Sequence, residues 1–379
     1  MKKKIINSLI FILCYFVIDY SLSSLFLFKI INKDLEKIYY SDLNNRIPNK
    51  DYKYTFKPNS QFYSKYNDFI YEINTNNFGF RDRKINFIKP DIQKKIYFFA
   101  GDSFLEGVGL NYKDTLIGQL AERTNNEYLL LNSGVASYSP YLYKRKIISF
   151  LENNKDFKIE KIIILFDKSD PIDDSRFKNH NGEFKVDYNN SNFIYKKRFS
   201  EKFTTFAFLK LFANYLDESQ RNLKYRYKLS KKYELNFFEF TNNQVIAFKS
   251  IGNRKFITNY YTNDNIWNDK TKNYISDSFN YINEVRNYLN KKNIELEIFI
   301  YPWAYELANS DLSEKYIELI YSISKSKSLI LHNCYDYFYE NNSLDQLEAI
   351  GKNYLFGDVH YNSNGNKILS SCIKDKLKL

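Results

Sequence analysis

The sequence predicts an α/β protein in which helices cover both faces of a central parallel sheet of about five strands. From residue 95 onward, short apolar runs alternate with stretches of helical periodicity. The run from Ile162 to Phe166 is apolar at every position, as expected of a strand that is buried on both faces of a parallel sheet. Strands that alternate with helices favour right-handed crossovers, and therefore a three-layer sandwich.

The predicted elements follow one another in a regular order. Strands are expected over residues 95–100, 128–131, 161–166, 294–301 and 328–331. Helices are expected over residues 115–123, 141–151, 274–289, 313–324 and 364–377. Between the third and fourth strands the sequence is irregular and polar, with one helix-like piece at 204–216. We therefore expect one domain over residues 76–379, with an insertion at about 171–265.

The N-terminus has the pattern of a membrane segment. Three lysines at positions 2–4 precede residues 5–28, which are rich in Ile, Leu, Phe and Val and exceed the roughly 20 residues that cross a bilayer. A cleavable signal peptide and a buried soluble helix are the alternatives, but no small-x-small cleavage site follows. Asp19 opposes insertion by roughly 2.5–3.5 kcal/mol at mid-span. We expect a membrane anchor over 1–31, a stalk over 32–75 and an exported domain.

The charge balance and the cysteines exclude several classes of protein. Lys and Arg number 56 against 44 Asp and Glu, a net charge of +12. The lysines are scattered beside acidic residues and Asn, without a basic helix or a zinc-finger spacing, so we expect no nucleic-acid partner. Cys14 lies in the apolar segment, which leaves Cys334 and Cys372 as the one pair able to form a disulfide. No metal-ligand cluster is evident, and we expect neither a metal nor a cofactor.

Unusual residues follow the first predicted strand, at an edge of the sheet where active groups gather in parallel folds. The tripeptide Gly101-Asp102-Ser103 places a serine at the start of a helix. Free amides and the helix dipole at that position favour developing negative charge. The alternative interpretation is a turn followed by a helix N-cap, which explains most isolated occurrences of such a tripeptide.

Two further loops follow the second and third strands. Gly134 lies in the run Asn132-Ser133-Gly134, where the lack of a side chain allows a backbone amide to approach a ligand. Ser169 and Asp170 follow the third strand and could direct a donor into the same site. A simple turn and an ordinary surface loop would have the same sequences, so neither loop indicates a site by itself.

A possible base lies near the C-terminus. Asp358 stands two residues before His360, which is one of three histidines in the chain. An aspartate at this spacing can orient and charge-balance an imidazole, as the base of a nucleophile requires. For an isolated Asp-x-His, the alternative interpretations are a pair of surface residues without a functional role or a metal ligand. No His, Asp and Glu cluster at metal-ligand spacing accompanies it.

Taken together and in this order, these motifs resemble those of the SGNH (GDSL-type) hydrolases over roughly residues 76–367, apart from the insertion. The resemblance implies a flavodoxin-like sheet, with Ser103 as nucleophile, His360 as base and Asp358 as the acid that orients it. It also implies that the amides of Ser103 and Gly134 form an oxyanion hole.

The sequence departs from the family pattern at two points. Ser169 stands where an Asn usually completes the oxyanion hole, and the Asp358-x-His360 spacing is one residue tighter than the commonest form. A serine hydroxyl could still donate, so Ser169 is the expected third donor. Asp102, Asp170 and Trp303, which follow the first, third and fourth strands, are expected to line the substrate cleft.

The resemblance implies a serine esterase or O-acyltransferase without a cofactor. Exported, membrane-anchored members often act on acetyl groups of cell-surface polysaccharide, so an acylated extracytoplasmic carbohydrate is the expected substrate. One alternative is a weak or inactive member of the fold that binds glycans or assists assembly. Another is a cytoplasmic lipase at the membrane surface.

Overall fold

The computed structural model describes residues 10–11, 14–21, 42, 44–66, 69–90, 93–178, 223–236, 238–252, 269–309, 314–340 and 342–379. The chain divides into two compact units. One comprises Met1–Ser41 and Lys185–Phe240, and the other comprises Asp42–Phe184 and Thr241–Leu379. The second unit contains the sheet and all the candidate site residues, and the elements described below belong to it.

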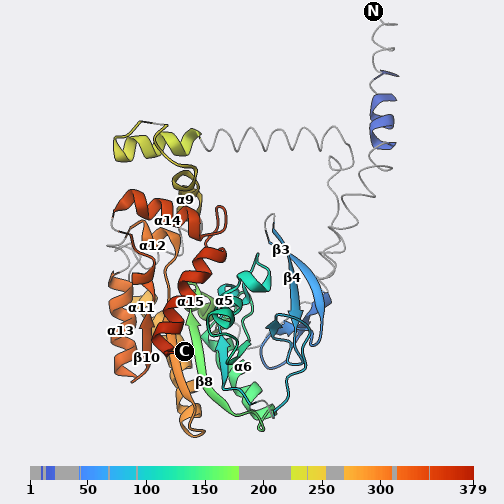
Figure 1. Cartoon of the computed structure of the whole chain (residues 1–379), viewed down its shortest axis with the longest axis vertical. Coiled ribbons are helices and arrows are strands. Elements are labelled where there is room, and N and C mark those ends of the chain that lie inside the picture. The colour runs from blue at the N-terminus through green and yellow to red at the C-terminus, as the bar shows by residue number, and fades with distance from the viewer. Residues whose placement is uncertain are drawn as a thin grey trace, which may run out of the picture. The chain divides into compact units, whose positions relative to one another are not determined.

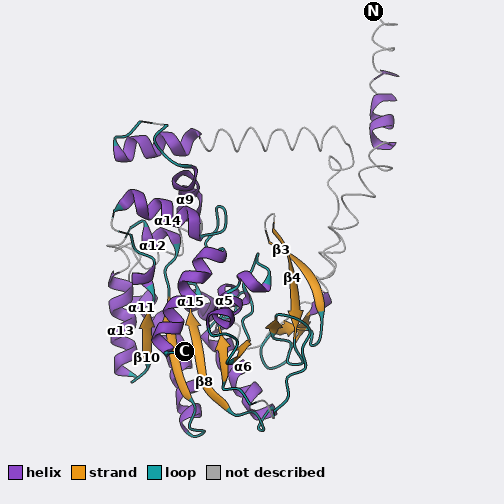
Figure 2. Cartoon of the chain, viewed as in Figure 1, coloured by secondary structure: helices purple, strands orange, loops and turns teal. Residues whose placement is uncertain are grey.

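The second unit is built on an eight-stranded sheet in the order β10-β9-β8-β6-β7-β5-β4-β3. Figure 2 colours its strands orange and the helices around them purple. Its five parallel strands are β6 (Ile96–Ala100), β7 (Leu129–Asn132), β8 (Ile159–Phe166), β9 (Glu295–Ile300) and β10 (Ile330–Asn333). Numbered along the chain, these strands lie in the order 2-1-3-4-5, which is the flavodoxin-like order. The predicted parallel sheet of five strands is therefore confirmed.

Helices cover both faces of this sheet. The chain passes from β6 to β7 toward one edge of the sheet, whereas the connections from β7 to β8, β8 to β9 and β9 to β10 run toward the other edge. Because such connections are right-handed, the helix of the first connection lies on one face of the sheet and the helices of the other connections lie on the opposite face. Accordingly α5 packs against α15, whereas α11 packs against α6 and α13 (Figure 1). These helices are α5 (Leu116–Arg123), α6 (Pro140–Asn153), α11 (Asp269–Asn290), α13 (Glu314–Ser326) and α15 (Ser363–Leu377). All five were predicted, with ends shifted by a few residues.

Three antiparallel strands extend the sheet beyond β7, and the two outer ones, β3 and β4, come from the expected stalk. They are β3 (Gln61–Tyr66), β4 (Phe69–Thr75) and β5 (Arg81–Asp82), while β1 (Arg46–Pro48) and β2 (Tyr54–Phe56) pair separately. In β3, buried Phe62 and Ser64 alternate with exposed residues, the pattern of a half-buried strand. The residues from Asp42 onward thus belong to the compact unit of the sheet, which begins earlier than the expected residue 76.

The structure has further helices outside the five predicted ranges, and one of them, α4, begins at Ser103 as expected. They are α4 (Ser103–Glu106), α7 (Asp170–Lys178), α9 (Asn242–Gly252), α12 (Ala304–Leu307) and α14 (Ser343–Asn353), with short 3-10 turns at Tyr112–Asp114 and Tyr335–Tyr337. Helices α7 and α9 fall in the segment expected to be an irregular insertion, and α9 packs on α14. The helix expected at 204–216 lies outside the described residues.

The predicted membrane segment at 5–28 is described at residues 10–11 and 14–21, which are helical. Its remaining residues lie outside the described ranges. None of the helices within those ranges combines the length and the apolar character that crossing a bilayer requires. The anchor over 1–31 therefore stays a prediction.

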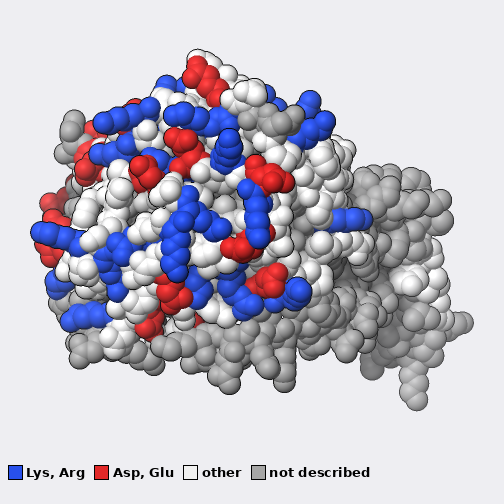
Figure 3. All heavy atoms as spheres, turned by 90° about the horizontal axis from the view of Figure 1, so that it is seen from below, with Lys and Arg blue, Asp and Glu red and all other residues white. Residues whose placement is uncertain are grey.

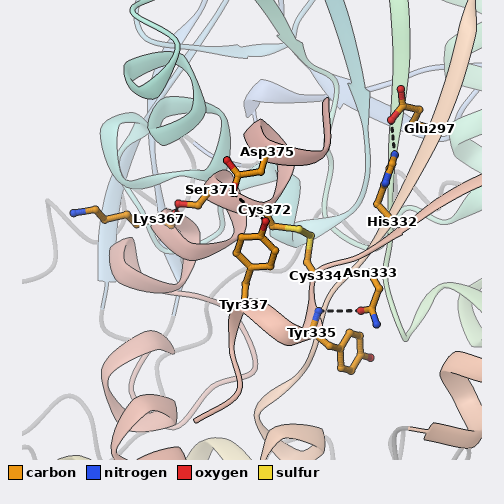
Figure 4. Close-up of a disulfide and its surroundings, with 10 residues drawn as sticks. All are labelled: Glu297, His332, Asn333, Cys334, Tyr335, Tyr337, Lys367, Ser371, Cys372 and Asp375. Atoms are coloured by element: carbon orange, nitrogen blue, oxygen red, sulfur yellow. Dashed lines mark hydrogen bonds and ion pairs between the residues drawn. A yellow bond between two sulfur atoms is a disulfide. The ribbon is translucent and has the colours of Figure 1, made fainter. Parts of the chain in front are cut away.

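The two cysteines left as a possible pair are joined. The Cys334–Cys372 disulfide links the residue that follows β10 to helix α15, across 38 positions of sequence (Figure 4). Cys14 is free and exposed. On the face that Figure 3 shows, Lys and Arg side chains alternate with Asp and Glu side chains, which agrees with a solvated surface of mixed charge.

Candidate active site

Ser103 is the first residue of helix α4, which begins directly after strand β6. Asp102 caps this helix, because its Oδ1 accepts a 3.0 Å hydrogen bond from the amide of Phe104. Gly107, at φ +77°, ends the helix after a single turn. The sequence thus folds locally so that the serine stands at a helix N-terminus, at the carboxyl end of a central parallel strand, and its side chain borders a cavity.

His360 lies against Ser103 although 257 positions separate them. Its Nε2 is 2.8 Å from the Ser103 Oγ, and its Nδ1 is 2.5 Å from Oδ1 of Asp358. The same Oδ1 accepts a 3.0 Å hydrogen bond from the backbone amide of His360. With the ring proton on Nδ1, Nε2 has a free lone pair toward the serine hydroxyl. The structure therefore brings all three predicted residues into one hydrogen-bonded row.

Tyr66 from strand β3 supports this row and was not singled out in the sequence. Its hydroxyl donates to Oδ2 of Asp358 at 3.0 Å, and its ring meets the His360 imidazole edge-on at 5.2 Å between centroids. Burial alone would raise the pKa of Asp358. Hydrogen bonds from the His360 ring and amide and from Tyr66 outweigh it and hold this pKa well below its usual value. Asp358 is therefore ionised and faces the imidazole as an anion.

In the loop that follows β7, Gly134 does not have the free amide that an oxyanion donor requires. The amide of Gly134 donates to Oδ1 of Asn132 at 3.0 Å, so it is engaged and does not fit the role of an oxyanion donor. A Cβ at Gly134 would lie 2.6 Å from the amide nitrogen of Glu106, so the glycine is needed for close packing against α4. Ser137, at φ +62°, lines the cavity beside Ser103 instead. Within the described part of the chain, the amides of Ser103 and Ser137 have no hydrogen-bond acceptor.

The third loop also differs from the expectation. Ser169 lines the cavity, but its hydroxyl and its amide both donate to Oδ1 of Asp167, at 2.6 and 2.8 Å. The indole of Trp303 donates to the other oxygen of Asp167 at 2.9 Å and is 1% exposed. Asp170 accepts from the hydroxyl of Tyr143 at 2.9 Å and is fully buried. Asp170 and Trp303 thus point into the core and do not line the cleft, whereas Asp102 does.

The cavity above Ser103 has a volume of about 340 Å³ and a largely polar and aromatic wall. One side comes from the expected stalk, with Tyr54, Lys65 and Tyr66 among its residues. Val108 and Ala136 are the aliphatic residues of the lining. Small concave sites of this kind suit a compact polar ligand better than a long apolar chain.

A buried ion pair joins the stalk segment to helix α4, which carries Ser103. Arg46 of β1 contacts both carboxylate oxygens of Glu106, at 2.7 and 3.2 Å, and Glu106 is completely buried. Glu106 also accepts a 2.6 Å hydrogen bond from the amide of Ala136. Burial would raise the pKa of Glu106, but Arg46 outweighs it and lowers that pKa. These contacts hold together β1, the helix that carries Ser103, and the loop that carries Ser137.

No family model matches this sequence, and no curated protein does. Solved structures similar to the chain include an acetyl xylan esterase, AlAXEase, at 14% identity and a TM-score of 0.38, over 74% of this chain and 99% of that one. A variant of an acetylxylan esterase from Geobacillus stearothermophilus is 10% identical, with a TM-score of 0.35 over 76% and 96%. The lipase/acylhydrolase from Enterococcus faecalis is 8% identical, with a TM-score of 0.36 over 75% and 95%.

Proposed function

We propose that this chain is an SGNH-type serine ester hydrolase or O-acyltransferase. The observation that carries the proposal is the row formed by the Ser103 Oγ, the His360 imidazole and the Asp358 carboxylate, with contacts of 2.8 and 2.5 Å. These are the contacts that an activated serine, its base and the orienting acid require. The row stands at a helix N-terminus beside the amides of Ser103 and Ser137, which have no acceptor among the described residues, and an anion is stabilised at such a position.

The residues support a two-step mechanism. As the Ser103 Oγ bonds to the ester carbonyl carbon, its proton passes to Nε2 of His360, and the amides of Ser103 and Ser137 hold the oxyanion. The imidazolium then gives this proton to the leaving oxygen as the carbon–oxygen bond breaks, which leaves an acyl-serine. A water molecule or a sugar hydroxyl next loses a proton to Nε2 as it attacks, and that proton returns to Oγ when the acyl group departs.

We further propose that the acyl group is small, with acetyl as the first candidate, and that the alcohol part is carbohydrate. A volume of about 340 Å³ and the shortage of aliphatic side chains in the lining disfavour a long acyl chain. Tyr54, Tyr66 and Lys65 provide a polar and aromatic surface for hydroxyl-rich ligands. Two of the similar solved structures carry names of acetylxylan esterases, which agrees with this choice.

The proposal predicts that a fluorophosphonate probe labels Ser103 and that the protein releases acetate from p-nitrophenyl acetate and from acetylated polysaccharide. A Ser103→Ala variant, which removes the Oγ that attacks, is the control for both measurements. Labelling is read by mass spectrometry of the peptide that contains position 103. Wild-type turnover no greater than that of Ser103→Ala, without labelling, would contradict the proposal.

A glycan-binding protein without turnover is the second candidate. It is favoured by one observation, the engagement of the Ser169 hydroxyl with Asp167, which leaves two backbone amides as oxyanion donors. This candidate predicts binding of an acetylated oligosaccharide by the wild type and by Ser103→Ala alike, with no acetate released by either. Isothermal titration in parallel with the acetate assay separates the two candidates.

We also propose that the site lies outside the cytoplasm and is tethered by the apolar segment at 5–28. The disulfide between Cys334 and Cys372 supports this location, because such bonds persist in oxidising compartments. In intact cells, an added protease should cleave the domain, and both cysteines should resist alkylation until a reductant is added. Protection from the protease together with alkylation of both thiols would place the domain in the cytoplasm instead.

A further inference from the structure

The Ser103 hydroxyl lies between two groups that can bond to it. Nε2 of His360 is 2.8 Å from Oγ on one side, and Oδ2 of Asp102 is 3.1 Å from it on the other. A serine hydroxyl has one hydrogen to donate and two lone pairs that accept. The hydrogen therefore goes to the imidazole or to the carboxyl group, and the choice depends on the state of Asp102.

Asp102 is 3% exposed, and its surroundings oppose a negative charge. Its Oδ1 accepts from the amide of Phe104, and Oδ2 faces the Ser103 hydroxyl. Several titratable groups interact electrostatically with Asp102. They include the carboxyls of Asp167, Asp170 and Asp173 and the phenols of Tyr143 and Tyr301. The His360 imidazole lies on the other side of the Ser103 hydroxyl. No ion pair to Asp102 occurs among the described residues. Burial, with a smaller contribution from the neighbouring Asp167 charge, raises the pKa of Asp102 well above its usual value.

We propose that Asp102 is held as a carboxylic acid whose Oδ2 hydrogen is donated to the Ser103 Oγ, so that the single serine hydrogen is directed to His360. Asp102 is then a positioning residue for the nucleophile as well as the cap of helix α4. The inference deepens the proposed function and rests on it.

The protonated state fits the direction of proton transfer. An ionised Asp102 would accept the serine hydrogen and compete with Nε2 for it, because a carboxylate has no hydrogen to donate. With the acid present, one lone pair of Oγ accepts from Asp102 and the other remains for the attack. The Asp102 proton stays on Asp102 throughout, and its hydrogen bond stabilises the charge that develops on Oγ as the serine proton passes to His360.

Two substitutions separate this role from helix capping. Asp102→Asn keeps an oxygen that can cap α4 and places an amide N–H donor toward Oγ. Asp102→Ser keeps the cap, because serine is also a preferred N-cap residue, but it has no second atom that reaches Oγ. We expect kcat for p-nitrophenyl acetate to stay within about fivefold of wild type in Asp102→Asn and to fall about 10-fold or more in Asp102→Ser, the worth of one hydrogen bond.

Thermal unfolding midpoints of both variants, compared with wild type, show whether the cap is intact. Equal midpoints with the split in kcat support the inference. A loss in Asp102→Asn as large as in Asp102→Ser would show that a carboxylate is required and would overturn it, as would full activity in Asp102→Ser. The wild type and Ser103→Ala are measured in the same assay. A wild type without Ser103-dependent turnover would overturn the proposed function and this inference with it, whereas an active wild type isolates the result for Asp102.

Discussion

Replacing Asp358 by Ala is expected to lower kcat by about 10⁴-fold, as removal of the acid of a serine triad does elsewhere. Oδ1 of Asp358 accepts both from Nδ1 and from the amide of His360, so the carboxylate fixes the tautomer and the orientation of the ring. Alanine removes that acceptor together with the negative charge beside the imidazolium. The measurement is kcat for p-nitrophenyl acetate, with the rate of fluorophosphonate labelling at Ser103 as a second readout.

Asp358→Asn gives a matched comparison, because both donors converge on one oxygen and an amide oxygen can take its place. The amide nitrogen would then face the Tyr66 hydroxyl, which can accept as well as donate. Asparagine should therefore preserve the tautomer, lose the charge, and reduce kcat less than alanine does. Equal losses in the two variants would contradict this account of orientation, and a loss below tenfold in Asp358→Ala would contradict the triad.

The sequence predicts the parallel sheet from local patterns, whereas it predicts the row of Ser103, His360 and Asp358 from the order of its motifs and their resemblance to a known family. Strand β8 is apolar at every position from Ile162 to Phe166, and a serine after strand β6 lies at the expected edge of a parallel sheet. The Asp358-x-His360 spacing is also local, since the aspartate contacts the ring and the amide of a residue two positions away. Tyr66 could not be found in this way, because 292 positions separate it from Asp358 and the chain has 35 tyrosines.

The Gly134 amide, expected to be an oxyanion donor, is engaged in the structure, and the reason is physical. Glycine is the residue that usually allows a close backbone approach, so sequence reasoning selected Gly134. In the structure, Asn132 binds the Gly134 amide, and the positive φ of this loop falls on Ser137, a residue type for which the sequence alone does not predict one. The positions of Trp303 and Asp170 after strands were predicted from the sequence, but the direction of their side chains was not. Their side chains turn into the core because Trp303 donates to Asp167 and Asp170 accepts from Tyr143.

The apparent stalk illustrates how tertiary pairing overrides composition. Its two longer strands, β3 (QFYSKY) and β4 (FIYEINT), lie among polar residues and prolines, which favoured a spacer at the level of composition. Pairing of β5 with β7 brings the segment to the sheet, and Arg46 then fixes it to the nucleophile helix. The segment expected to be a spacer therefore supplies one wall of the cavity, and its loss should affect both stability and activity.

Arg46→Met is expected to destabilise the protein by about 3–5 kcal/mol, the usual cost of breaking a buried pair and leaving one charge uncompensated. The Glu106 side chain has no exposed surface, and the Arg46 side chain is 19% exposed. The substitution retains the aliphatic stem but removes the guanidinium that neutralises Glu106. Urea unfolding of the wild type and the variant measures the difference. Arg176→Met removes the exposed partner of Asp173 and should cost less than about 1 kcal/mol as the matched control.

The double variant Arg46→Met with Glu106→Gln distinguishes an uncompensated charge from lost packing. Glutamine retains an oxygen that can accept from the Ala136 amide, as Glu106 does now, and it has no charge to leave unpaired. If the buried charge causes the loss, the double variant should recover most of the stability that Arg46→Met alone loses. If the double variant is as unstable as the single one, the contacts of Arg46 with β2, including its stacking 4.7 Å over Phe56, account for the effect instead. A loss in Arg46→Met no larger than in Arg176→Met would show that the segment from Asp42 to Tyr66 is held to the sheet without this pair.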